Sequence, residues 1–407
     1  MSVNDTGYAG DRALAIHPLV YFADGEEVTI GRPDIDSYAI FPPDGAELVR
    51  RLAAGATPDE AGRWYESEYG LTTSVDHVLA ALDELGFIRR DGEPAANAGQ
   101  VRWQRLGRAA FSPVAWIAYS SIIIWAIVVM VRAPALVPEY HDIFFTSYYT
   151  LIELGLFAGA IPLILLHESF HALAGRRLGL RSRLRISQRF YYMVVETAID
   201  GLVAVPRRKR YLPILAGMLI DTVALAALII AADLSREPAG ALSFAGRLCL
   251  AFAFAVALRL VWQFFFYIRT DLYVLMATVL GCVDLHTTAM RMLINRIKRL
   301  VGLRGRLADE SDWHPADRRA AQWYSWLILC GYLTSLTTLV FAGAPIAIHM
   351  FAGAIDRFTG TRTVSAGALT DSAVFLALNV SQVATTTWLA ARARAERRRA
   401  RLEHVIG

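Results

Sequence analysis

Long apolar stretches dominate the pattern of the chain after residue 110. Each of them approaches or exceeds the roughly 20 residues that a helix needs to cross a bilayer core. The six stretches lie at 114–131, 148–166, 212–232, 243–267, 323–350 and 367–390. The pattern therefore predicts a mainly α fold, a polytopic membrane helix bundle of about six spans.

The first part of the chain, residues 14–92, has a different pattern. Three short runs, HPLVYF, EVTIG and SYAIF, are rich in β-branched and aromatic residues and are bounded by turn residues such as Asp24 and Gly25. Runs of this kind are typical of short strands. A further strand is expected at 86–88, where glycine is followed by phenylalanine and isoleucine.

Three helices are expected after the first three strands. The first covers about 44–54, and the second begins at Thr57, where Pro58 and Glu60 complete a capping box. The third begins near Thr73 and has apolar residues at helical spacing on one face. Strands followed by helices predict an α+β, winged-helix-like domain ahead of the membrane part.

Composition and charge agree with a membrane protein. The chain of 407 residues is 55% hydrophobic and 19% charged, whereas soluble domains are about 25% charged. Lysine and arginine gather at 102–108, 176–189, 206–210, 291–306 and 391–401, and the intervening loops hold few. The positive-inside rule then predicts a multi-pass protein of the inner (cytoplasmic) membrane with both termini in the cytoplasm, and no secretory signal precedes the first span.

The net charge of +4 does not call for nucleic acid, because the basic surplus lies where anionic lipid would attract it. The lipid bilayer is the expected partner. Cys249, Cys282 and Cys330 are widely spaced in or beside apolar stretches. They are expected to be packing residues rather than a disulfide framework or a zinc cluster.

An unusual polar cluster, HESFH, lies inside the second apolar stretch. His167 and His171 stand four residues apart, so they share one helix face and can both ligate zinc, while Glu168 can act as a base on the metal-bound water. Ionisable residues within a membrane span are functional by default. The cluster therefore predicts a metal site.

Three segments together resemble the site-2 protease family of intramembrane zinc metalloproteases, in its peptide-maturation branch. They are HESFHALAGRRLGL, LPILAGMLIDTVALAAL and FYIRTDLYVLMATVLGCVDLHTTA, within residues 148–290. The resemblance implies one zinc ion per chain, held by His167, His171 and Asp271, with Glu168 as the catalytic base.

A second aspartate competes for the role of third ligand. Leu272 stands where the family has a glycine after its ligand aspartate, so the usual tight turn is not assured. Asp221 stands where the family has an asparagine and lies about 15 Å into its span, near the depth of His167. Asp221 is therefore either the third ligand or a group that hydrogen-bonds beside the metal.

The front domain carries its own resemblance. The segments ADGEEVTIG, SYAIFPPDGAELVRRLAAGATPDEA and VDHVLAALDELGFIRR are similar to the domain that recognises precursor peptides in the biosynthesis of ribosomally made, modified peptides (RiPPs). The resemblance implies that a leader peptide adds as a strand at Tyr38, Ala39, Ile40 and Phe41. The alternative is an ordinary winged-helix domain for dimerisation or DNA binding, although no strongly basic helix favours DNA.

These observations divide the chain into a recognition domain and linker at 1–100, a metalloprotease core at 101–290 and a basic segment with the last spans and tail at 291–407. Residues 183–205 are rich in strand formers, which predicts an edge strand beside the site or a surface loop. The expected function is zinc-dependent removal of the leader from a precursor peptide. The alternatives are a protease for a transmembrane regulatory protein, or a non-catalytic transporter, immunity protein or peptide-binding scaffold.

Overall fold

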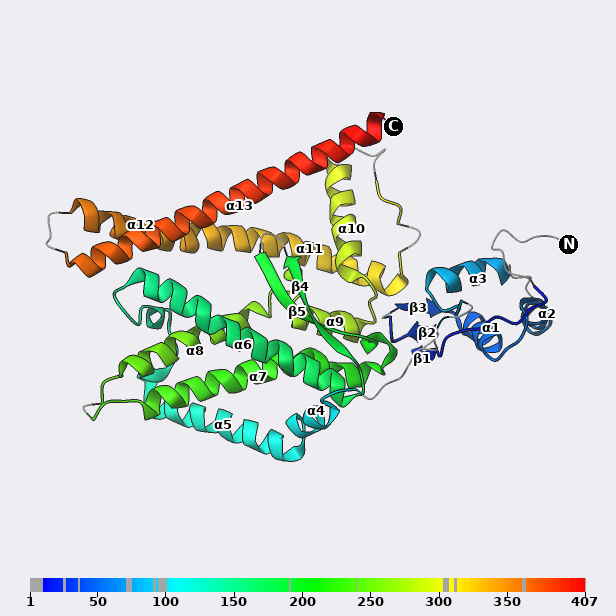
Figure 1. Ribbon diagram of the computed structural model, residues 1–407, viewed down its shortest axis with the longest axis horizontal. Coiled ribbons are helices and arrows are strands. Elements are labelled where there is room, and N and C mark those ends of the chain that lie inside the picture. The colour runs from blue at the N-terminus through cyan, green and yellow to red at the C-terminus, as the bar shows by residue number, and fades with distance from the viewer. Residues whose placement is uncertain are drawn as a thin grey trace.

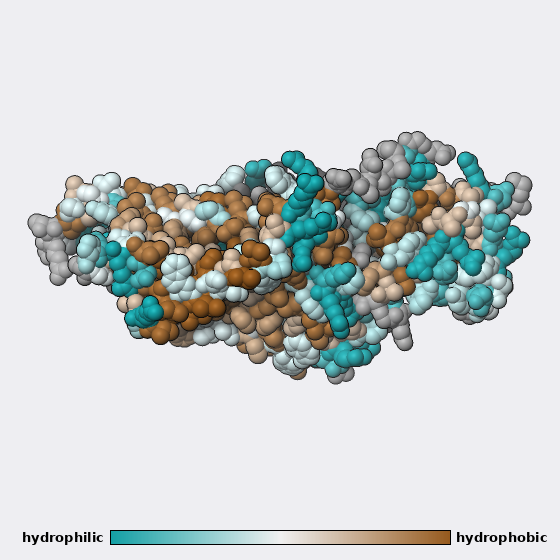
Figure 2. All heavy atoms as spheres, turned by 90° about the horizontal axis from the view of Figure 1, so that it is seen from below, coloured by the Kyte–Doolittle hydropathy of each residue, from teal (hydrophilic) through white to brown (hydrophobic). Residues whose placement is uncertain are grey.

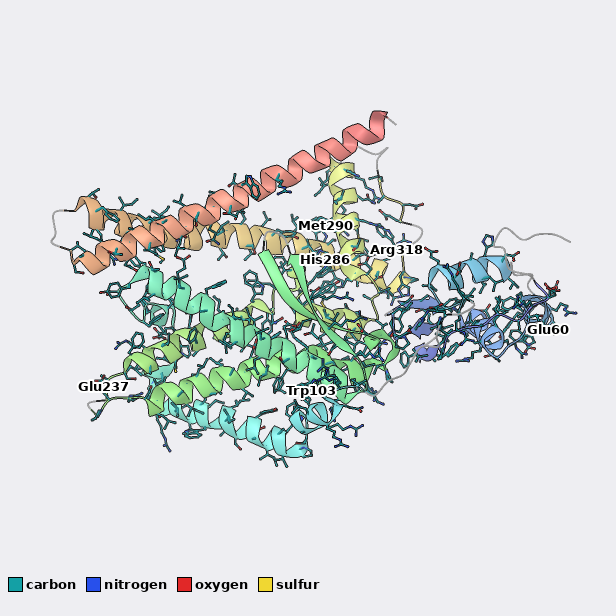
Figure 3. All side chains as sticks on the ribbon, viewed as in Figure 1. Glu60, Trp103, Glu237, His286, Met290 and Arg318 are labelled. Atoms are coloured by element: carbon teal, nitrogen blue, oxygen red, sulfur yellow. The ribbon has the colours of Figure 1, made fainter. Side chains whose placement is uncertain are left out.

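The protein is mostly helical, with two small antiparallel sheets. This computed structural model describes residues 10–24, 27–35, 37–70, 75–90, 93, 101–189, 192–238, 240–302, 307–310, 313–360 and 364–406. Glu60 on the front domain and Glu237 in a distant loop mark opposite ends of the elongated molecule (Figure 3). The predicted turn residue Gly25, the start near Thr73 and most of the linker at 92–100 lie outside the described residues.

The front domain is a three-stranded sheet covered on one face by helices (Figure 1). Its strands are Val20–Asp24 (β1), Glu27–Arg32 (β2) and Ser37–Phe41 (β3), and its helices are Pro43–Ala53 (α1), Pro58–Tyr69 (α2) and Val75–Glu84 (α3). The capping box at Thr57 and Glu60 is confirmed. The predicted closing strand is wrong in extent, because Ile88 makes only an isolated bridge to Ile16.

Long helices form the rest of the molecule and run side by side for much of their length (Figure 1). In order they are Gln104–Ala110 (α4), Pro113–Arg132 (α5), Tyr149–Arg177 (α6), Arg207–Leu234 (α7), Phe244–Trp262 (α8), Asp271–Leu280 (α9), Leu285–Leu300 (α10), Pro315–Thr338 (α11), Ala344–Thr359 (α12) and Ala366–Ile406 (α13). A π-helical stretch, Leu339–Gly343, joins α11 to α12.

Among the described residues, five helices are long and apolar enough to cross a membrane: α5, α6, α7, α8 and the one that begins at Pro315. The bent pair α9 and α10 raises the number to six if it counts as one span. Helix α13, which holds the predicted stretch 367–390, is not among the five, and Asn379, Gln382 and Thr385 interrupt its apolar run. Figure 2 shows apolar side chains gathered over the long helices and polar ones over the front domain.

A β-hairpin lies between α6 and α7 in the chain and crosses the middle of the molecule (Figure 1). Ser182–Arg189 (β4) pairs with Tyr192–Ile199 (β5), so the strand alternative for residues 183–205 is confirmed. β-branched residues along β5 favour this extended form. The hairpin packs on α6 mainly through β5.

A sharp bend separates α9 from α10, whose axes differ by 89°. The carboxylate of Asp317, at the start of α11, accepts hydrogen bonds from the backbone N–H groups of Val283 (3.0 Å) and Asp284 (2.9 Å). Asp317 is buried. It therefore satisfies two amides that the bend would otherwise leave without partners.

The α12–α13 hairpin is joined to α6 by a polar cluster. Asp371 accepts hydrogen bonds from the backbone N–H groups of Tyr149 and Thr150, both at 2.9 Å, and Arg357 donates to the same carboxylate at 3.2 Å. These amides begin α6, where backbone N–H groups have no partner inside the helix. The cluster thus caps α6 and attaches α13 to it.

The front domain rests on the core through the sheet face opposite α1. Strands β1 and β2 contact a short 3-10 helix, Leu202–Ala204 (η3), that follows β5. Glu27 pairs with His314 at 3.1 Å, and the guanidinium of Arg210 lies over the ring of Phe22. The front domain and the helical part of the chain therefore meet at the end of the molecule where β5 leads into α7.

The first prediction concerns independent folding of the front domain, whose buried cluster contains only its own residues. A fragment of residues 1–100 should unfold cooperatively, as followed by circular dichroism. Leu52→Ala should lower its free energy of unfolding by about 2–5 kcal/mol, because Leu52 is fully buried. The matched change Ile40→Ala, at an exposed position, should alter it by about 0.5 kcal/mol or less. Equal effects of the two would contradict the described core.

Candidate metal centre

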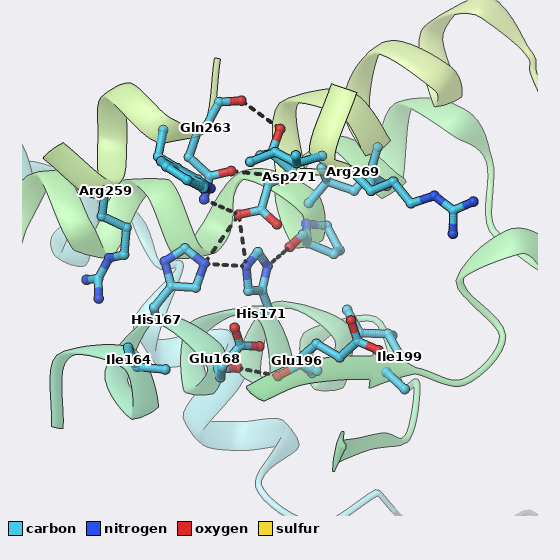
Figure 4. A pocket seen from close by; sticks show the side chains of 18 of the residues that line it. Ile164, His167, Glu168, His171, Glu196, Ile199, Arg259, Gln263, Arg269 and Asp271 are labelled. Atoms are coloured by element: carbon cyan, nitrogen blue, oxygen red, sulfur yellow. Dashed lines mark hydrogen bonds and ion pairs between the residues drawn. The ribbon is translucent and has the colours of Figure 1, made fainter. Parts of the chain in front are cut away.

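Three side chains from two helices converge on one point (Figure 4). The Nε2 atoms of His167 and His171 lie 3.1 Å apart, and Asp271 Oδ2 lies 3.3 Å from each of them. The histidines come from successive turns of α6, and Asp271 is the first residue of α9. Four ligands at about 2.0–2.1 Å from a tetrahedral ion stand about 3.3 Å apart, so these three atoms have the spacing of one face of such a site.

The hydrogen bonds on the far sides of the imidazole rings determine which nitrogens face the centre. His171 Nδ1 lies 2.7 Å from the carbonyl oxygen of Pro213, which can only accept, so Nδ1 carries the proton. His167 Nδ1 lies 2.9 Å from Asp221 Oδ2 and donates to that carboxylate. In the neutral rings both Nε2 atoms are therefore acceptors, and they meet a third acceptor on Asp271.

With neutral rings and an ionised carboxylate, three acceptors at this separation repel one another, and a cation among them removes the repulsion. The two histidines are less than a tenth exposed, so water screens the repulsion poorly. A divalent metal ion supplies the missing positive charge, and nitrogen and carboxylate ligands suit such ions. The donor set, its spacing and its protonation thus fit a metal ion.

Asp221 lies beside the triad rather than in it. Asp221 is on α7, and its carboxylate accepts the hydrogen bond from Nδ1 of His167, on the side of the ring that faces away from the triad. The same carboxylate is bound by Arg259 of α8. The Arg259 Nε donates to Oδ2 at 2.8 Å, and its Nη2 donates to Oδ1. Asp221 is almost fully buried. Arg259 compensates its charge, and the resulting chain orients the ring of His167. Of the two alternatives left by the sequence, the geometry favours Asp271 as the third ligand.

Gln263 holds Asp271 from two directions. Its side-chain Nε2 donates to Asp271 Oδ2 at 3.1 Å, and its Oε1 accepts from the backbone N–H of Asp271 at 3.0 Å. The backbone carbonyl of Gln263 also accepts from the hydroxyl of Thr270, whose side chain caps α9. The loop between α8 and α9 is thereby anchored at its end.

The turn before Asp271 is made without glycine. Arg269 has a φ of +58°, in the left-handed region that few side chains adopt. Leu272, which replaces the glycine of the resembled family, lies in the first turn of α9 and needs no special conformation. The tight turn therefore occurs two residues before the aspartate.

Close packing of α7 on α6 depends on a glycine. A Cβ atom at Gly217 would collide with Nε2 of both His167 and His171. Helix α7 consequently passes directly beside the triad, with only a hydrogen atom between its backbone and the rings. A larger residue at this position would displace the histidines.

A cavity of about 520 Å³ opens onto the triad. Glu168, Glu196 and Arg269 are among its lining residues, which come from α6, β5, η3, α7, α8, α9 and the loops around them. Thr197 of β5 donates a hydrogen bond to the backbone carbonyl of Glu168 at 2.9 Å, which ties the hairpin to the HESFH segment. The cavity thus joins the triad, an acidic side chain and one strand of the hairpin.

Two residues of the centre were missed by the sequence analysis. Arg259 is an ionisable residue inside an apolar stretch, a signal that could have identified it. Gln263 gives no such signal, because a polar residue after a helix is ordinary. The candidate peptide-binding residues Tyr38, Ala39, Ile40 and Phe41 lie on β3 of the front domain and do not line the cavity.

No protein-family model, curated protein or solved structure matches this chain.

The second prediction ranks the aspartates by metal affinity. Asp271→Ala removes a ligand, so purified protein should lose its bound metal ion to a chelator far more readily than the wild type. Asp221→Ala and Gln263→Ala remove only groups that orient ligands and should weaken affinity about 10–100-fold. Metal content after dialysis against graded chelator, measured by mass spectrometry, gives the order. A greater loss in Asp221→Ala than in Asp271→Ala would transfer the ligand role to Asp221.

Proposed function

We propose that this protein is a membrane-embedded zinc metallopeptidase of the site-2 protease type. The observation that carries the proposal is the convergence of the buried His167 and His171 on the half-buried Asp271, with Glu168 lining the same cavity. Hydrolytic zinc sites have three protein ligands and an open fourth position. Two histidines and a carboxylate are one of the donor sets that zinc uses in such sites.

Zinc bound there would polarise a scissile carbonyl and lower the pKa of a water molecule. Glu168 follows His167 on α6, and its carboxylate lines the cavity rather than joining the ligand triangle. In the proposed reaction Glu168 would take a proton from the attacking water and deliver it to the leaving nitrogen. The chain Arg259–Asp221–His167 keeps one ligand oriented while charge develops at the centre.

The proposal places the long helices across the cytoplasmic membrane. Five of them have the length and hydropathy that a span requires. Lysine and arginine flank the ends near the front domain, and the positive-inside rule assigns those ends and both termini to the cytoplasm. The metal centre then lies at the cytoplasmic side of the membrane, where water has access.

Strand β5 is placed to hold a substrate in extended form. Its residues Glu196, Thr197, Ala198 and Ile199 line the cavity, and among the described residues β5 pairs with β4 along one edge alone. An edge strand can pair with another chain through main-chain hydrogen bonds. Extension matters because a helical peptide shields its amide bonds from attack.

A precursor peptide recruited by the front domain is the proposed substrate. β3 is an edge of the front sheet, and the same sheet rests on η3, whose Leu202 lines the cavity. A leader bound along β3 is thus held on a domain adjacent to the metal centre. Such tethering raises the effective concentration of the scissile segment. A transmembrane regulatory protein is the alternative substrate.

The third prediction separates catalysis from binding. Glu168→Gln should retain about one zinc ion per chain, because this residue is outside the ligand triangle. Cleavage should fall by at least about 100-fold, the scale of general acid–base catalysis. Metal content and precursor cleavage are measured on the same reconstituted sample. Zinc retention with undiminished cleavage would show that Glu168 is not the catalytic base. The matched control is His171→Ala, which should lose the metal ion and the cleavage together.

The fourth prediction tests recruitment at β3. Amide groups alternate in direction along a strand, so only one of Ala39 and Ile40 directs its N–H away from β2. Proline at that position should abolish leader binding without loss of thermal stability, whereas proline at the other should break the β2–β3 pairing and destabilise the domain. Calorimetric titration of the precursor into each variant measures the binding. Wild-type affinity in both variants would favour a transmembrane regulatory protein as substrate.

A further inference from the structure

Helix α10 presents an apolar stripe on its exposed side. Ile294 and Ile297 of the helix and Val301, its C-cap residue, follow one another at i, i+3 and i+7 spacing, and they are 42%, 48% and 69% exposed. At 100° per residue these three lie within one narrow sector of the helix. The helix packs mainly against α11, through the opposite sector that contains the buried Leu285 and Met292.

Basic residues flank this stripe. Arg291 and Lys298 are seven residues apart and adjoin Ile294 at i−3 and i+4, so they lie along one border of the apolar sector. A helix with an apolar face bordered by arginine and lysine has the composition of helices that lie in the headgroup region of a bilayer. Anionic lipid attracts such basic residues.

The direction of α10 agrees with this placement. It turns by 89° from α9 and runs across α11 (Figure 1), and His286 and Met290 mark its first half in Figure 3. The segment 307–310 is bonded to the far side of the helix, through Asn295 and Arg299. The apolar stripe therefore faces away from that segment. If α10 crossed the bilayer instead, Arg291 and Lys298 would have to enter the hydrocarbon region.

We propose that α10 is an interfacial helix that docks on the surface of an anionic bilayer. Ile294, Ile297 and Val301 enter the boundary between headgroups and acyl chains, and Arg291 and Lys298 bind headgroup phosphates. The proposal rests on the membrane placement of the long helices, and it is independent of the metal chemistry.

Site-directed fluorescence tests this docking in the full chain. Cys249, Cys282 and Cys330 are first replaced by alanine, and an unchanged circular dichroism spectrum and thermal midpoint confirm that the variant folds. A single cysteine is then introduced by Ile297→Cys or by the matched control Arg299→Cys, two exposed positions on different sides of α10. Each is labelled with an environment-sensitive dye and reconstituted in phosphatidylcholine vesicles with phosphatidylglycerol.

Dye at position 297 should be quenched by brominated acyl chains and protected from aqueous iodide, and dye at position 299 should show the reverse. Phosphatidylglycerol in the vesicles should increase the acyl-chain quenching of the dye at position 297. In the double variant Arg291→Gln/Lys298→Gln this increase should disappear. Iodide access at 297, equal quenching at both positions, or an unchanged phosphatidylglycerol effect would each overturn the proposal. A third label, at Ile124→Cys on α5, reports the membrane placement separately: without acyl-chain quenching there, the placement itself fails.

Discussion

The convergence of three hydrogen-bond acceptors in a buried place is the constraint on which the rest of the structure depends. His167 and His171 have their Nδ1 atoms engaged by a carboxylate and a carbonyl, so in the neutral rings their Nε2 atoms are acceptors. Asp271 adds a negative charge to the same point. A cation between such groups stabilises a fold that brings them together, so metal binding there would be coupled to folding of this region.

Several residues outside the triad help to position His167, His171 and Asp271. Gly217 allows α7 to pass against the histidine rings, and Gln263 holds the aspartate from its backbone and its side chain. Asp317 keeps the bend after α9, so the helix that begins with the third ligand is held at both of its ends. None of these residues belongs to the triad, yet each removes a freedom that would misplace a ligand.

The arrangement also relates the soluble domain to the membrane part. The front sheet rests on η3, which follows β5, and both line or adjoin the cavity. A peptide that bound the front domain, as proposed, would therefore begin its path near β5, the strand that would hold it extended. At the opposite end of α6, the Asp371 cluster attaches the last hairpin to the helix that carries HESFH. Helix α6 thus contacts α4, α7, α8, α13 and both strands of the β4–β5 hairpin.

The sequence by itself determined the local features: the apolar helices, the capping box and the shared helix face of His167 and His171, because each follows from periodicity or spacing within a few residues. For residues 183–205 it left a strand and a surface loop open, and the structure decided for the hairpin. Only the tertiary structure distinguished Asp271 from Asp221 and revealed Gln263, since their positions depend on how α7, α8 and α9 pack around α6. The structure also shows a single β-bridge where the sequence predicted a closing strand. Local patterns carry no information on which residues distant in the sequence come into contact, and the candidate metal centre consists of such contacts.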